Sequence, residues 1–140
     1  MRCIRKIIVA VGFFSVFFAV IAEIPGSTEK KVRDARTQQK LAETNYYDGY
    51  YISALSRYKS AYLSYMQAKE FDQASDILLT LSDIYLEMGK PDSCRMFFNR
   101  AENLIHQQQI DDPVTHVKLT LVKAGIFISL SEFEKYAGFY

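Results

Sequence analysis

The chain has 140 residues, enough for one domain, and 49% of them are hydrophobic, which excludes an intrinsically disordered protein. The formal net charge is +1, but Arg2, Arg5 and Lys6 lie at the N-terminus, and the rest of the chain is slightly acidic, with 14 basic and 16 acidic residues. The lack of a dense basic cluster argues against nucleic-acid binding through this segment, because contacts to phosphates need clustered Lys and Arg.

Residues 1–22 have the layout of a signal peptide or signal anchor. The basic start is followed by an apolar run from Ile7 to Ala22, and the small residues Val20 and Ala22 suit cleavage after Ala22. The run of 16 residues is short for a membrane span, which usually needs about 20. Both forms predict an exported protein, periplasmic or in the cell envelope, which contacts the membrane only if the leader is not cleaved.

Residues 23–28 are predicted to be a linker, because Pro25 and Gly26 interrupt a helix. A helical domain is then expected over residues 29–140. With three prolines, six glycines and no long strand-like alternation, the fold is predicted to be all-α. The first helix is expected to end near Tyr47, and its polar composition suits the end of a stack of helices.

Seven of the ten tyrosines lie between Tyr46 and Tyr65. Four of them do not match obvious packing positions: Tyr47, Tyr50, Tyr62 and Tyr65. They either fill gaps between helices or form a ligand surface, since tyrosine is common at interfaces. Both interpretations stay open at this point.

The segment from Leu78 to Ala101 predicts two antiparallel amphipathic helices joined at Gly89. Glycine allows the left-handed backbone that ends a helix, and Pro91 suits the first position of the next helix. Asp111 or Asp112 is expected to cap a later helix that begins at Pro113.

Counting outward from Gly89 and Gly49 gives nearly the same order of small and aromatic residues, except that Asn45 replaces an aromatic residue before Gly49. Counting from Ser131 gives a weaker third copy. The pattern predicts three hairpin units, roughly 29–69, 70–110 and an incomplete 111–140, spaced by 40 and then 42 residues. The predicted packing positions are Ala42, Gly49, Tyr51, Ala54, Tyr58, Ala61, Leu81, Ser82, Tyr85, Gly89, Cys94, Phe98, Ala101, Ala124, Phe127 and Phe133.

This arrangement resembles tetratricopeptide repeats, although the family's usual spacing is about 34 residues. The resemblance covers roughly Thr37 to Tyr140 and implies a right-handed solenoid of stacked hairpins. It also implies a non-catalytic scaffold that binds a protein or peptide, or an extracytoplasmic sensor module. Because the third unit stops within its second helix, we expect the chain to be the N-terminal part of a longer protein. Exported arrays of this kind in bacteria often precede a membrane helix and a DNA-binding or kinase domain.

The sequence contains no convincing catalytic constellation, so neither enzyme activity nor a cofactor is expected. His116, Asp111 and Asp112 could touch a metal, but capping explains the aspartates, and no metal site is predicted. Cys94 is expected to be buried and inert. The alternative function is a surface accessory that binds carbohydrate or a small molecule through the tyrosine-rich helix.

Overall fold

A computed structural model describes the backbone of residues 25–137 and the side chains of residues 26–129 and 131. The described chain forms α1 (Pro25–Tyr47), α2 (Tyr51–Ala68), α3 (Phe71–Glu87), α4 (Pro91–Gln108) and α5 (Pro113–Ala137). The prediction of an all-α fold is therefore confirmed for this part of the chain. The predicted leader at residues 1–22 lies outside the described residues. Of the helices that are described, none has the length and apolar composition required to cross a membrane.

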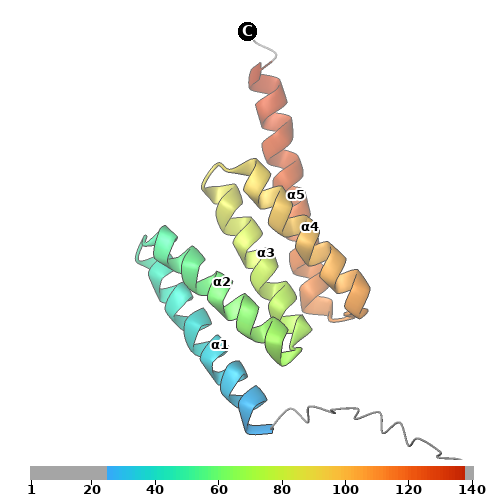
Figure 1. The fold of residues 1–140 in the computed structure, drawn as a ribbon. Coiled ribbons are helices and arrows are strands. Elements are labelled where there is room, and N and C mark those ends of the chain that lie inside the picture. The colour runs from blue at the N-terminus through green and yellow to red at the C-terminus, as the bar shows by residue number, and fades with distance from the viewer. Residues whose placement is uncertain (1–24, 138–140) are drawn as a thin grey trace, which may run out of the picture.

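The helices form two antiparallel hairpins, α1–α2 and α3–α4, followed by α5 (Figure 1). The middle helix α3 packs against α2, α4 and α5, whereas the backbone of α1 packs closely on α2. The most deeply buried large side chains accordingly include Ile77, Leu78, Leu79 and Leu81 of α3. The core of the domain is thus centred on α3.

All four inter-helix connections begin with the same turn. Gly49, Lys69, Gly89 and Gln109 have positive φ and follow one another at intervals of 20 residues. In each turn the next N–H donates to a carbonyl five residues back, as Lys90 does to Tyr85 at 2.9 Å and Ile110 does to Ile105 at 3.0 Å. This is the Schellman pattern, which satisfies carbonyls that a helix end would leave exposed. The regular placement of these turns gives the described helices α2 to α4 nearly equal lengths.

The packing repeats with a period of 40 residues. In the first helices of successive units, one buried column contains Ala35, Ser75 and Thr115, and a second contains Ala42, Ser82 and Val122. In the second helices, the matching buried pairs are Ala54 and Cys94, Tyr58 and Phe98, and Ala61 and Ala101. Most of these residues are small, which lets neighbouring helices approach closely. The described helices therefore form a repeat with a constant register.

The third unit differs from its prediction. α5 continues without a turn through Ser131, and the side chains of Ala124 and Phe127 are exposed. The period of 40 places Val122 and Gly125, not Ala124 and Phe127, in the positions of Ser82 and Tyr85. Ser129 stands where Gly89 stands one period earlier, and serine lacks the freedom of glycine to end a helix in the left-handed conformation. The side chain of Phe133 lies outside those described.

The predicted linker also needs correction, because α1 begins inside it at Pro25. Proline is well suited to the first position of a helix, where its missing N–H has no partner to lose and its φ is already helical. Gly26 follows in the first turn, where a Cβ would meet no atom within 4 Å. Proline and glycine therefore mark the start of this helix and do not interrupt it.

The left-handed turns give a paired test. Gly89→Ala places a Cβ in a left-handed conformation and should lower the free energy of unfolding by about 1 kcal/mol, whereas Gln109→Gly removes that penalty and should raise it by about 1 kcal/mol. Urea unfolding followed by circular dichroism measures both. Gly26→Ala, in a right-handed helical turn, is the control and should be neutral or slightly stabilising. Destabilisation by Gln109→Gly would contradict this account of the turns.

Candidate functional site

The first helices of the second and third units, α3 and α5, enclose a cleft of about 200 Å³. Its lining consists of Leu79, Thr80 and Asp83 from α3 and Lys118, Leu121 and Val122 from α5. Leu79 and Val122 are buried and form an apolar floor, while Leu121 is 65% exposed at the rim. We call this cleft the α3–α5 groove.

Asp83 is the acidic residue of the groove lining, and two further carboxylates lie on the same face of α3. Asp76, Asp83 and Glu87 are spaced by seven and four residues, so they lie along one face of α3. Burial raises the pKa of Asp83, and the negative charge of Glu87 adds to this effect. From the end of α1, the hydroxyl of Tyr46 donates to Glu87, which raises the pKa of Tyr46. On the opposite side, Lys118 forms an ion pair with Asp76.

Gly125 lies against the Leu86 side chain of α3. A Cβ at this position would lie 2.9 Å from Leu86 Cδ2, which is closer than carbon atoms normally approach. Glycine avoids this contact, which alanine would relieve by a shift of the flexible end of the Leu86 side chain. Sequence reasoning missed this residue, although a single glycine inside a long helical pattern is itself a signal of a packing requirement.

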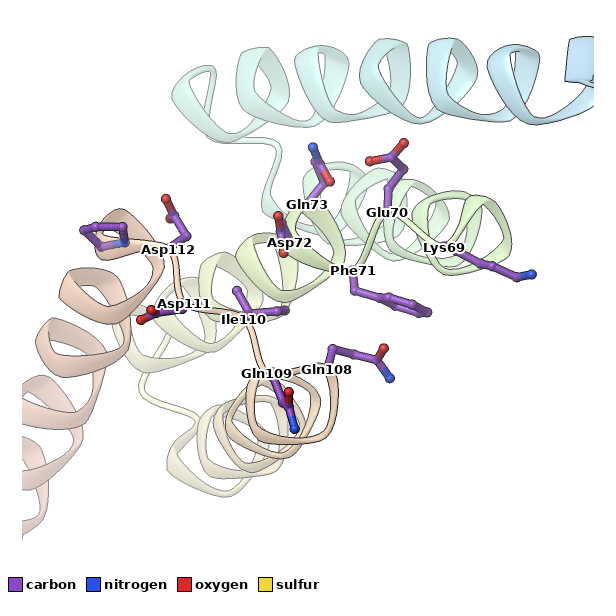
Figure 2. Close-up of a pocket in the computed structure, with 11 residues that line it drawn as sticks. Lys69, Glu70, Phe71, Asp72, Gln73, Gln108, Gln109, Ile110, Asp111 and Asp112 are labelled. Atoms are coloured by element: carbon purple, nitrogen blue, oxygen red, sulfur yellow. The ribbon is translucent and has the colours of Figure 1, made fainter.

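A second cleft, of about 500 Å³, lies where the α2–α3 and α4–α5 connections run side by side (Figure 2). It carries the carboxylates of Glu70, Asp72, Asp111 and Asp112. The backbone N–H and the hydroxyl of Thr115 donate to Asp112 at 2.7 and 2.9 Å, and these bonds lower the pKa of Asp112. Asp112 therefore caps α5. It is one of the two aspartates, Asp111 and Asp112, that the sequence predicts for this role.

His116 and Cys94 both have polar neighbours in the structure. His116 Nε2 lies 3.7 Å from Asp111 Oδ1, and both side chains are exposed. Among the side chains that the structure describes, no three His, Cys, Asp or Glu gather as a metal site would require. Cys94 is fully buried, and its burial raises the pKa of the thiol. The hydroxyl of Ser82 donates to the Cys94 carbonyl at 2.9 Å, so this thiol sits at a helix–helix contact.

The four tyrosines singled out in the sequence do not form one surface. Tyr47 and Tyr50, at the α1–α2 turn, are 84% and 64% exposed. Tyr62 is half-buried, with Arg100 positioned 5.9 Å above its ring. Tyr65 is only 1% exposed, and its hydroxyl donates to Gln39 at 3.0 Å. The hypothesis that Tyr65 touches a ligand is therefore wrong, because α1 covers it.

Two predicted packing tyrosines lie nearer the surface than expected. Tyr51 is 44% exposed and meets Tyr46 edge to face at 5.6 Å. Tyr85 is half-buried and stacks on Phe97 at 5.3 Å, and Lys59 donates to its hydroxyl at 3.1 Å. These rings join neighbouring helices at the edge of the core.

Comparison of the chain with protein-family models, curated proteins and solved structures finds no match. The candidate sites are therefore assessed from their own geometry.

Buried tyrosines should make stability fall at alkaline pH. Burial raises the pKa of Tyr58 from 10 to about 12, so the folded state holds this proton more tightly than the unfolded state. The resulting stability is present below pH 10 and is lost as the pH rises from 10 to 12. Tyr58→Phe should reduce the decrease in the free energy of unfolding across that pH range, as measured by urea unfolding. The pH dependence that remains should come from Tyr46 and Tyr65. The exposed-site control Tyr50→Phe should follow the wild type; an unchanged slope in Tyr58→Phe would contradict the assignment.

Proposed function

We propose that this protein is a non-catalytic binding module whose α3–α5 groove holds a segment of a protein or peptide partner. The observation that carries the proposal is the groove itself, which combines a buried apolar floor with a polar rim between two first helices of the repeat. Binding sites in proteins generally show this combination of apolar lining and a few polar groups.

The chemistry of the groove indicates how a partner would be held. Leu121, the exposed apolar residue of the lining, offers contact to one apolar side chain of a partner above the buried floor. The rim groups Thr80 and Asp83 can bond the polar atoms beside it. The Asp83 side chain is exposed at the rim, so its carboxylate can accept a hydrogen bond from a donor of the partner. The partner segment is thus expected to combine an apolar residue with a nearby hydrogen-bond donor.

The wider biological setting follows from the sequence resemblance. We propose that the hairpins are tetratricopeptide-like repeats that stack as a solenoid, and that the basic-then-apolar leader exports them to the periplasm or cell envelope. There the module would act as a scaffold or as the sensing part of a larger protein. The constant period of 40 residues supports a repeat array, while the family assignment rests on the arrangement of small and aromatic residues.

A display library of short peptides, selected against the full chain in non-ionic detergent, tests the groove. Peptides that bind the wild type should lose at least tenfold in affinity for Asp83→Lys, because the new cation reverses the charge at the rim. Asp48→Lys, which makes the same change at the exposed α1–α2 turn, is the matched control and should retain affinity. Selected peptides that do not distinguish the two variants would show that the groove is not the binding site.

A second candidate, carbohydrate binding, is favoured by the exposed rings at the α1–α2 turn. Tyr47 lies edge to face with Tyr46, at 5.7 Å between ring centroids, and Tyr50 follows at the end of the same turn. Aromatic faces of this kind can stack on sugar rings.

For this candidate, the double variant Tyr47→Ala and Tyr50→Ala should abolish signals on a glycan array while leaving the helical circular dichroism intact. Ile52→Ala, at another exposed apolar residue near the turn, should keep those signals. A wild type that binds no glycan would eliminate this candidate.

A further inference from the structure

α5 carries a stripe of exposed apolar side chains. Val114, Val117, Leu121 and Ile128 are 62%, 59%, 65% and 55% exposed, and Ala124 between them is exposed as well. Their spacing alternates between three and four residues, so the five side chains lie in one row along the helix. We call these five residues the α5 stripe.

The same row occurs one period earlier, in α3, where it is covered. Forty residues before the α5 stripe stand Ala74, Ile77, Leu81, Ile84 and Met88. The first four are at most 3% exposed, and Met88 is half-buried. In the second unit this row is therefore a helix–helix interface. By the symmetry of the repeat, the α5 stripe has the pattern of a packing face and not that of a solvated face.

The charges beside the stripe are directed toward the domain. Lys118 forms an ion pair with Asp76, and Lys123 Nζ lies 3.8 Å from Glu102 Oε1. From Pro113 to Ser131 the sequence of α5 contains no acidic residue. Covering the stripe with another apolar helix would thus bury no charge of the stripe itself, and the two lysines keep their partners on α3 and α4.

We propose that the α5 stripe binds the α5 stripe of a second copy of this chain, with the two helices antiparallel. A row with alternating spacings of three and four is the pattern of a two-helix seam. In the antiparallel register, Leu121 lies opposite Ala124 of the second copy, and Val117 lies opposite Ile128. Each of these pairs recurs on both sides of a twofold axis, as a self-complementary interface requires. The antiparallel helix dipoles add a favourable term.

The expected strength follows from the size of the patch. The exposed side chains of the stripe, together with the neighbouring Phe127, present on the order of 500 Å² on each copy, so that pairing would bury about 1,000 Å². This total lies at the lower limit for a specific interface, and a dissociation constant in the micromolar range is therefore expected. The stripe shares Leu121 with the lining of the groove proposed for partner binding, whereas Val117 and Ile128 are not part of that lining. Changes at Val117 and Ile128 therefore test dimerisation separately from binding in the groove.

Sedimentation velocity of the full chain in non-ionic detergent tests the dimer over about 1 to 100 µM. The wild type should dimerise, and Val117→Lys and Ile128→Glu should each weaken association at least tenfold, because each buries a charge against an apolar residue. Mixing the two variants in equal amounts should restore association, since Lys at 117 of one copy then faces Glu at 128 of the other. Both sites are exposed, so the circular dichroism should not change.

Ile52→Glu is the matched control, because Ile52 is 74% exposed on α2 and lies outside the stripe, and its dissociation constant should equal that of the wild type. The leader is identical in every variant, so association through it would not respond to these changes. A wild type that stays monomeric at about 100 µM, or a mixture that fails to restore association, would overturn the proposal. Either result would mean that the α5 stripe does not pair with the α5 stripe of a second copy.

Discussion

The structure depends on the close approach of helices at small buried residues. Ser82 and Cys94 meet between α3 and α4, where the Ser82 hydroxyl bonds the Cys94 carbonyl at 2.9 Å. In the first hairpin Ala42 and Ala54 occupy the same positions and are fully buried. A larger side chain at these points would force the helices apart, because protein interiors have no free volume to absorb it. The aromatic residues around these contacts then fill the space that remains.

This packing leaves α5 with two different surfaces. One side meets α3 and α4 through Thr115, Val122 and the close contact at Gly125, and it builds the groove with α3. The α5 stripe runs along the exposed side, and its Leu121 also borders the groove. Because the two surfaces share a rigid helix, a partner in the groove and a second copy on the stripe would be held in a fixed relation. A dimer built in this way would present two grooves related by a twofold axis.

The third unit shows where pattern matching on the sequence fails. Its small and aromatic residues can be aligned with the earlier units in two registers, two residues apart. Counting back from Ser131 selects Ala124 and Phe127, whereas the buried columns select Val122 and Gly125. All four residues lie within one helical segment, so the order of residue types in the sequence does not distinguish the two registers. Contact with α3 does, because one face of α5 can pack against it and the opposite face cannot.

By itself, the sequence determined the all-α class, the turns at Gly49 and Gly89 and the helix start at Pro113, because these depend on the local backbone preferences of glycine and proline. It could not determine the left-handed turns at Lys69 and Gln109, where the packing of the flanking helices imposes a conformation that neither residue prefers. Tertiary structure alone also decided that Tyr65 is buried while Tyr47 is exposed, and that α3 and α5 form a groove. Those outcomes depend on which faces of distant helices meet, and no local preference specifies that.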